Sequence, residues 1–210
     1  MNYISKHCRI RNRVIARDGQ VVYGNNGDSL DEFMDLAFAS LSIAYPKFYK
    51  MDRLSKLGFL GSEVLLKGEK LLDKYRPERI AVVISNSNAS LDTDLKYFES
   101  TKTIASPALF VYTLSNIVAG EICIRQAIKG ENAFFVLPHF DAARLVEYVE
   151  IVMASPKTEA CIAGWVDVLG EQHDVLLYLL EKSKDGGLEH TAEQLQKLYQ
   201  KNYGPVDGGS

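Results

Sequence analysis

The 210-residue chain is poor in cysteine and in long apolar runs. Its three cysteines, Cys8, Cys123 and Cys161, have no metal-like spacing. An odd, scattered set of thiols is typical of a reduced, cytosolic protein rather than a disulfide-stapled secreted one. No apolar run has the length needed to cross a bilayer, and the N-terminus lacks a signal-peptide pattern. We therefore expect a cytoplasmic protein without a membrane span.

Positive charge is also scarce. Lys and Arg number 24 against 27 for Asp and Glu, so the formal net charge is −3. Proteins that bind nucleic acid usually present a basic surface, and this composition therefore predicts no nucleic-acid partner. No internal repeat or low-complexity segment interrupts the chain. Its length suits one large domain that can bury a real core.

What the sequence does contain is an alternation of apolar strands and amphipathic helices. Residues 79–85 are predicted to form a buried strand, because residues 80–84 are an unbroken apolar run, as expected for a strand covered on both faces. Other strands are predicted at residues 2–10, 20–23, 133–137, 159–169 and 175–180. Helices are predicted at residues 29–44, 52–75, 91–99, 106–129 (with a break near 115–116), 141–153 and 191–203. This pattern indicates one α/β domain, a mixed sheet flanked by helices.

The predicted helix at residues 52–75 contains three glycines, Gly58, Gly61 and Gly68. Each costs roughly 1 kcal/mol relative to Ala inside an exposed helix. Their presence suggests that the helix backbone packs closely against a neighbour, as a central helix does.

Two segments are candidates for function because of where they lie. The polar loop at residues 86–90 follows the buried strand 79–85, and ligand sites in open α/β sheets lie at such strand ends. We favour a plain loop that precedes the next helix, with a ligand loop as the alternative. His139 lies in the corner between strand 133–137 and helix 141–153. The positive end of a helix dipole is a place where enzymes present nucleophiles, and there the dipole favours neutral imidazole.

Other reactive side chains favour structural interpretations. Cys123 lies in the middle of a helix with no base beside it, so we interpret it as a buried structural thiol. Glu171, His173 and Asp174 cluster on a predicted turn rather than on one helix face, so we predict no metal site there. The sequence implies no cofactor.

One long motif spans residues 106–139. It reads Ser-Pro-x-x-Phe, then Asn-x-x-x-Gly-x-Ile-x-Ile-Arg, then Lys-Gly-x-Asn, followed by a strand and His139. Shorter motifs accompany it at residues 51–57, 79–85 and 160–165. Together and in order, these segments resemble the N-terminal half of the β-ketoacyl-acyl carrier protein synthases, which have the thiolase-type fold. The matching residues of the long motif are Ser106, Pro107, Phe110, Asn116, Gly120, Ile122, Ile124, Arg125, Lys129, Gly130 and Asn132.

The resemblance implies an acyltransferase, a 3-oxoacyl-acyl carrier protein synthase, but the sequence departs from the family in two ways. His139 stands at the position of the family's nucleophilic Cys, and Glu131 replaces a Pro of the motif. The chain also has about half the length of a ketosynthase, and the other half carries the family's two catalytic histidines and its Lys. Without these groups, neither acyl transfer nor decarboxylative condensation has its reactive parts.

The resemblance covers most of residues 1–170. We therefore assign residues 1–182 to a ketosynthase N-terminal-like domain, half of a thiolase-like fold. Residues 183–210 are assigned to a linker, a short C-terminal helix and a frayed tail.

Three functions are compatible with these observations. The first is a non-catalytic ketosynthase-like subunit, resembling the chain-length factors, that scaffolds or shapes a fatty-acid or polyene/polyketide-type pathway. The second is an enzyme, or an acyl-carrier or acyl-chain binding protein, that uses His139 and the 86–90 loop. The third is a relic domain. A half-fold should expose the face that the missing half would cover, and large exposed apolar patches mark partner sites. We therefore expect a homodimer or a heterodimer with a ketosynthase, with acyl carrier protein as a further partner.

Overall fold

A computed structural model describes residues 1–25, 28–182 and 187–204. These residues form a mixed β-sheet with the strand order β3-β2-β1-β7-β6-β4-β5, and β8 pairs with β1 beside this path. The strands are β1 (Tyr3–Arg11), β2 (Val14–Arg17), β3 (Gln20–Gly24), β4 (Ile80–Asn86), β5 (Asn132–Val136), β6 (Ala160–Leu169), β7 (Gln172–Glu181) and β8 (Leu188–Glu189).

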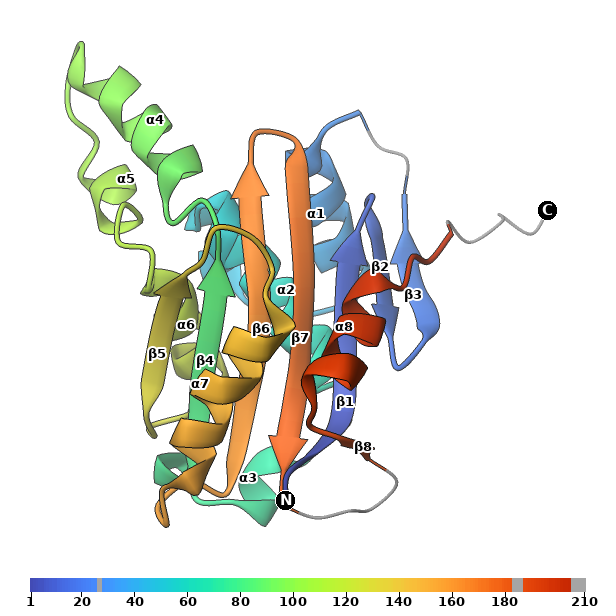
Figure 1. Cartoon of the computed structure of the whole chain (residues 1–210). Helices are drawn as coiled ribbons and strands as arrows, with labels where there is room; N and C mark the ends of the chain where they lie inside the picture. The colour runs from blue at the N-terminus through green and yellow to red at the C-terminus, as the bar shows by residue number, and fades with distance from the viewer. Residues whose placement is uncertain (26–27, 183–186, 205–210) are drawn as a thin grey trace.

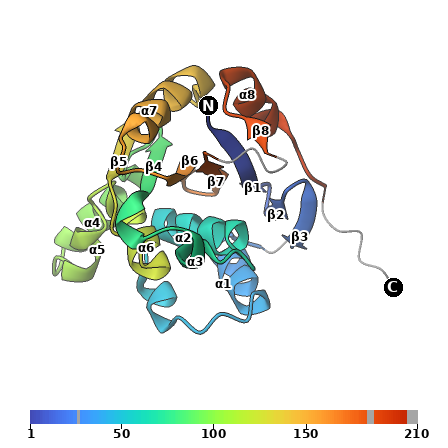
Figure 2. The same ribbon diagram turned by 90° about the horizontal axis from the view of Figure 1, so that it is seen from below.

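Helices cover both faces of this sheet, as Figures 1 and 2 show. One face carries α1, α2 and α6, and the other carries α7 and α8. The helices are α1 (Leu30–Ser40), α2 (Arg53–Leu65), α3 (Leu71–Lys74), α4 (Leu91–Thr101), α5 (Pro107–Val111), α6 (Ile117–Gln126), α7 (Ala142–Ala154) and α8 (Ala192–Gln200). The expected mixed sheet flanked by helices is confirmed. None of the helices in the described ranges is long and apolar enough to span a membrane.

The buried strand β4 lies between β6 and the edge strand β5. It pairs in parallel with both β5 and β6, and all seven of its residues are buried. This confirms the strand predicted from the unbroken apolar run. Because β4, β5 and β6 point the same way, their carboxyl ends lie side by side, at the top of the sheet in Figure 1. The 86–90 loop and His139, the two candidate segments of the sequence, both lie at these strand ends.

The glycine-containing helix is shorter than predicted. The helix ends at Leu65. Gly68 has a φ of +78°, a left-handed conformation that glycine adopts with less strain than other residues. A Cβ at Gly58 would come within 2.4 Å of Val118, and one at Gly61 within 2.9 Å of Leu177. Close backbone packing is therefore confirmed for Gly58 and Gly61. It is wrong for Gly68, which lies beyond the helix end.

The N-terminal hairpin contains a strand that the sequence prediction missed. Strand β2 lies between β1 and β3, so residues 20–23 form the third strand rather than the second. The β1–β2 turn uses Asn12 and Arg13 at φ values of 52° and 58°, without the glycine that usually marks such turns. A register shift between Ile4 and Lys6 also moves Ile4 to the opposite face from Cys8 and Ile10.

Several predicted boundaries shift by a few residues. Helix α1 begins as predicted, because the Ser29 hydroxyl accepts a hydrogen bond from the Glu32 backbone N–H, but it ends at Ser40. The break near residues 115–116 separates α5 from α6, and α8 ends at Gln200 instead of 203. Leu188–Glu189 forms β8 within the predicted linker. Residues 183–186 of that linker lie outside the described part, as does the predicted frayed tail from residue 205 onward.

Candidate functional site

His139 lies at the predicted strand-to-helix corner. Strand β5 ends at Val136, and α7 begins at Ala142 after the cap Asp141, whose carboxylate accepts the Arg144 backbone N–H at 3.0 Å. The imidazole is exposed and borders an open depression of about 410 Å³. The far wall of this depression comes from α8, through Ala192 and Gln196.

The structure gives His139 no chemical partner. Within the described residues its side chain makes no hydrogen bond and no ion pair. Asp141 lines the same depression, but its carboxylate is engaged in capping α7. Nucleophilic and general-base catalysis both rest on paired side chains held within hydrogen-bond reach. An exposed imidazole without such a pair can contact a ligand, but it has no orienting group.

The 86–90 loop lies next to this corner but is occupied by its own contacts. The Leu137 backbone N–H donates to the Asn86 carbonyl at 2.8 Å, which brings the two segments together. The Asp167 carboxylate on β6 accepts hydrogen bonds from the backbone and side chains of Ser87 and Asn88, at 2.8 to 3.1 Å. The Asn86 side chain brackets the backbone of Ala89. These contacts use the loop's polar groups internally, which supports the plain-loop interpretation.

The cysteines are poorly suited to nucleophilic chemistry. Burial raises the pKa of Cys123 to about 11 and that of Cys8 to about 12, and it also raises the pKa of Cys161. The thiolate is the reactive form, so these thiols are protonated and inert at neutral pH. The interpretation of Cys123 as a structural thiol agrees with its half-buried position on α6.

The acidic residues near the β6–β7 turn pair with arginines. Burial favours a higher pKa for Asp174, but hydrogen bonds from Arg9 and Arg11 outweigh it and hold that pKa below its ordinary value. Glu171 forms ion pairs with Arg13 and Arg53. In the described ranges, no group of three or more His, Cys, Asp or Glu residues could hold a metal ion.

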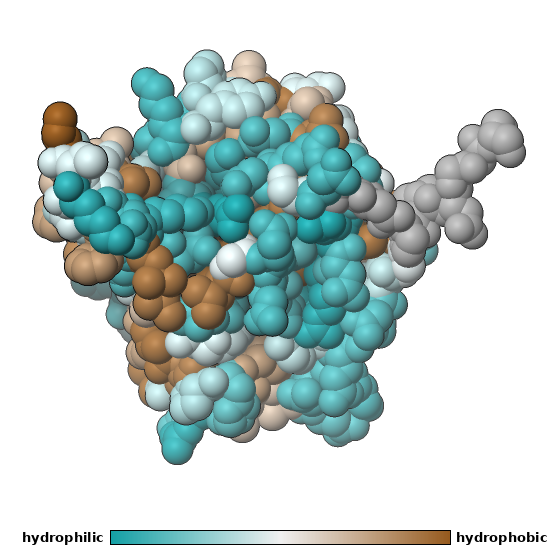
Figure 3. Space-filling model, turned by 90° about the horizontal axis from the view of Figure 1, so that it is seen from above, coloured by the Kyte–Doolittle hydropathy of each residue, from teal (hydrophilic) through white to brown (hydrophobic). Residues whose placement is uncertain are grey.

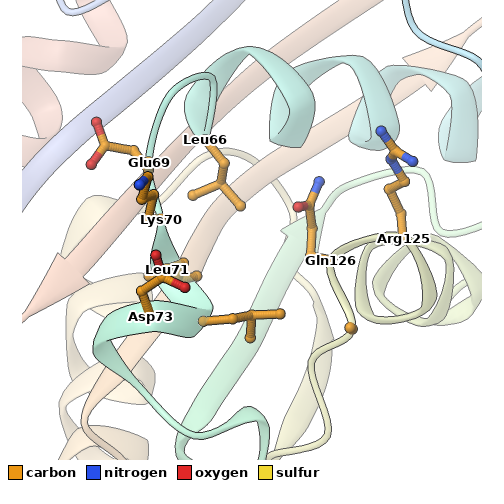
Figure 4. A pocket seen from close by; sticks show the side chains of 9 residues that line it. Leu66, Glu69, Lys70, Leu71, Asp73, Arg125 and Gln126 are labelled. Atoms are coloured by element: carbon orange, nitrogen blue, oxygen red, sulfur yellow. The ribbon is translucent and has the colours of Figure 1, made fainter.

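A second depression, which no sequence signal indicated, lies between the ends of α2, α3 and α6 (Figure 4). It has a volume of about 350 Å³ and is lined by Leu66, Leu71 and Arg125 among others. The Arg125 guanidinium binds the Glu63 carboxylate through two hydrogen bonds of 2.8 and 2.9 Å. In this chain, the arginine of the long motif therefore ties α6 to α2.

Exposed apolar side chains gather on one side of the molecule, along α4, α5, α6 and the edge strand β5. Helices α4 and α5 project from the body of the protein in Figure 1, and Figure 3 shows large hydrophobic patches toward that side. We call this region the β5 surface. Its exposed large apolar residues are Leu91, Leu95, Phe98, Ile104, Phe110, Val111, Leu114, Ile124 and Val136.

Strand β5 itself is an open edge of the sheet, paired only with β4 in the described strands. Its two phenylalanines point to opposite faces: Phe134 packs against the α2 core and Phe135 against the α7 core. An edge strand presents unpaired backbone N–H and C=O groups, which can pair with another chain. The apolar pattern of residues 133–137 predicted the strand but not its place at the edge of the sheet.

No protein-family model matches the sequence, and the search of curated proteins finds no match. Solved structures do match. The ishigamide ketosynthase/chain length factor gives a TM-score of 0.60 at 16% identity, over 88% of this chain and 63% of that chain. A β-ketoacyl synthase from Burkholderia phymatum STM815 gives 0.55 at 12% identity, over 87% of this chain and 59% of that chain. The protein has the ketosynthase fold. The predicted resemblance and the thiolase-like architecture are thereby confirmed.

The chain spans less than two thirds of these two structures. A third match differs in extent: a chain of the complex described as a ketosynthase (ApeO) with its chain length factor (ApeC) from Xenorhabdus doucetiae. It gives a TM-score of 0.55 at 14% identity, over 94% of this chain and 90% of that chain. A ketosynthase-like chain of nearly the same extent as this one therefore occurs within a two-protein assembly.

Proposed function

We propose that this protein is a non-catalytic, ketosynthase-like subunit. It acts in the manner of a chain-length factor, paired with a ketosynthase in fatty-acid or polyene/polyketide-type biosynthesis in the cytoplasm. One observation carries the proposal: the ketosynthase fold is present, yet the corner that should present the nucleophile holds an exposed His139 without a catalytic partner. A ketosynthase fold that lacks the catalytic nucleophile suits a subunit that binds and shapes a partner enzyme.

The β5 surface supports a protein partner. Exposed apolar side chains that gather on one side of a protein mark interaction sites. Nine exposed large apolar residues lie between Leu91 and Val136, next to an open strand edge. The edge supplies backbone hydrogen bonds, and the helices supply apolar contact area. Together they suit a partner that itself presents a strand edge, as a ketosynthase-fold subunit does.

Gly120 on α6 also supports a protein partner. It belongs to the long motif, and a glycine inside a helix costs roughly 1 kcal/mol relative to alanine. A Cβ at Gly120 would meet no atom within 4 Å, so packing within the described chain does not require glycine there. A partner backbone that approaches α6 closely, next to the exposed Ile124, supplies the missing reason.

A ketosynthase is the occupant that we favour. Two of the matched structures are described as ketosynthase and chain length factor pairs, and another as AntDE with the acyl-carrier protein AntF. The ApeO–ApeC match also shows that a chain of this extent takes part in such a pair. Acyl carrier protein is then a partner of the assembly.

The experiment is co-expression with each Cys-containing ketosynthase of the same genome, followed by purification and analysis of the acyl product. We expect a stable complex, and we expect a His139→Ala variant to assemble and to leave product amount and chain length unchanged. Loss of product from a His139→Ala complex that still assembles would overturn the proposal. It would favour the alternative, an enzyme or acyl-binding protein that uses the depression beside His139.

A further inference from the structure

The α7 face of the sheet is already covered by the chain's own C-terminal segment. Helix α7 packs on β4 and β6, and α8 lies beside it, over β1 and β7 (Figures 1 and 2). Leu195 and Leu198 of α8 are fully buried in the same core as Ile4, Leu176 and Leu180. Within the described parts of α7, β8 and α8, only Ile151 and Leu188 are large, apolar and exposed.

The same segment extends the sheet. Leu188 and Glu189 form β8 and pair with Ile4 and Tyr3 of β1, next to where the β1–β2 pairing ends. The segment also reaches the His139 corner, because the Tyr199 ring stacks on Phe140 at 3.6 Å between centroids. Helix α8 therefore forms one wall of the depression that His139 borders.

A partly buried chain of hydrogen bonds holds the segment at its start. The His190 side chain is fully buried, and its Nδ1 lies 2.6 Å from Glu150 Oε1 of α7. Its Nε2 lies 3.0 Å from the Tyr178 hydroxyl of β7. With Nδ1 protonated toward the carboxylate, Nε2 accepts the Tyr178 proton, so both ring nitrogens of a neutral imidazole are satisfied. Asn2 donates to the other Glu150 oxygen at 2.7 Å and accepts the His190 backbone N–H.

A second polar cluster holds the segment at its end. The Arg9 side chain is 1% exposed and is bound by Asp174, and it also donates to the Tyr199 carbonyl at 3.1 Å. The Tyr199 hydroxyl donates to Asp174 at 2.8 Å. The guanidinium groups of Arg9 and Arg11 each lie 4.8 Å from the Tyr199 ring. Removing α8 would break the hydrogen bonds of Tyr199 with Arg9 and Asp174 and remove the ring that both guanidinium groups contact.

We infer that residues 188–200 form an intramolecular lid that takes the place of a covering domain on the α7 face. The Glu150–His190–Tyr178 hydrogen bonds lock this lid. The inference goes beyond the proposed function because it concerns the isolated chain. It assigns the α7 face to the protein's own interior, and it leaves the β5 surface as the side on which a partner docks.

The test is hydrogen exchange on the full-length protein. In Glu150→Ala, we expect amides of residues 188–200 to exchange at least about tenfold faster, while those of α2 and β4 keep their wild-type rates. Glu147→Ala is the matched control, because Glu147 lies on the same helix and pairs only with Arg144 at the surface. Equal lid exchange in the two variants would overturn the lock.

A second arm tests the lid against a partner domain. When a ketosynthase binds, we expect residues 188–200 to keep the protection of the free chain. Loss of that protection on binding would mean that the partner displaces α8, and would overturn the inference. This outcome is separate from failure of the proposed function, since the first arm needs no partner at all.

Discussion

The two sides of this molecule have opposite surfaces. On the α7 side, most apolar residues of α7 and α8 are buried in one core, and the side chains of His190 and Arg9 form hydrogen bonds within the chain. On the β5 side, Phe98, Phe110 and their neighbours are exposed beside an open strand edge. The expectation that a half-fold exposes a face of the sheet is wrong for the described chain, because helices cover both faces; the exposed apolar residues lie toward the edge strand β5 instead.

This contrast separates a sheet face that the chain covers itself from a strand edge that stays open in the described structure. A sheet face needs a covering layer to bury its apolar side chains. The chain supplies that layer with α8, which the sequence pattern placed in a C-terminal appendage. The chain supplies no such cover for the edge strand β5 and its flanking helices, which are where we expect a partner to bind. The predictions below compare matched substitutions on the two sides.

The largest difference in stability is expected between Leu195→Ala and Leu95→Ala. Leu195 is fully buried on the inner side of the lid, whereas Leu95 is 54% exposed on the β5 surface. Leu195→Ala should lower the free energy of unfolding by about 2–5 kcal/mol. Leu95→Ala should change it by no more than about 0.5 kcal/mol. Urea unfolding measures both, and equal losses would remove the contrast between a closed and an open side.

The next effect concerns association. Phe98→Asp should weaken binding to the ketosynthase at least tenfold, about 1.4 kcal/mol, because it places a charge in a buried contact. The control is Ile151→Asp on α7, a site of similar exposure on the closed side. Titration followed by light scattering gives both affinities. If Ile151→Asp weakened the complex as much as Phe98→Asp, the partner would dock on the α7 side instead.

Gly120→Ala should act in opposite directions on stability and on assembly. The isolated chain should gain up to about 1 kcal/mol in unfolding free energy, because alanine favours the helix and its Cβ has open space. Ketosynthase binding should weaken, because the added methyl group obstructs the partner. Gly58→Ala is a contrasting variant that should destabilise the chain by itself, since its Cβ would clash with Val118. Undiminished partner binding in Gly120→Ala would exclude a close contact at α6.

The smallest effect is a pH dependence of the lid. Burial lowers the pKa of His190, although the hydrogen bond to Glu150 partly opposes this. The unfolded chain therefore binds the proton more readily than the folded one, and stability falls as the pH drops below the ordinary histidine pKa of about 6.5. His7 and His173 also have lowered pKa values because of burial. A His190→Gln variant should thus show a shallower, not a flat, fall in stability between about pH 7 and pH 5. An unchanged slope would exclude His190 as a contributor.

The parts of the fold that sequence predicted best are those with strong local signals. The apolar run of β4, the Ser29 cap of α1 and the break before α6 all have one dominant physical cause. The prediction of His139 at the corner before α7 also agrees with the chain trace, because a strand and a capped helix flank it. The role of His139 stays a prediction.

Other features depended on contacts between distant residues. Strand β2 was missed because Asn12 and Arg13 adopt positive φ without a glycine signal. The helix of the lid was predicted, but its hold on the sheet was not, because that hold comes from long-range pairs such as Arg9 with Tyr199, which no periodicity reveals. Matched motif residues also differ in what they do: Gly130 lies against the Ile80 carbonyl, whereas Gly120 has no close neighbour within the chain. A sequence pattern does not distinguish these cases.

The most direct test of the account is light scattering of the wild-type protein mixed with each Cys-containing ketosynthase of the same genome. The account predicts a complex with the mass of one subunit of each protein, or a symmetric multiple of it, with one of these enzymes. A self-contained homodimer that binds none of them would contradict it.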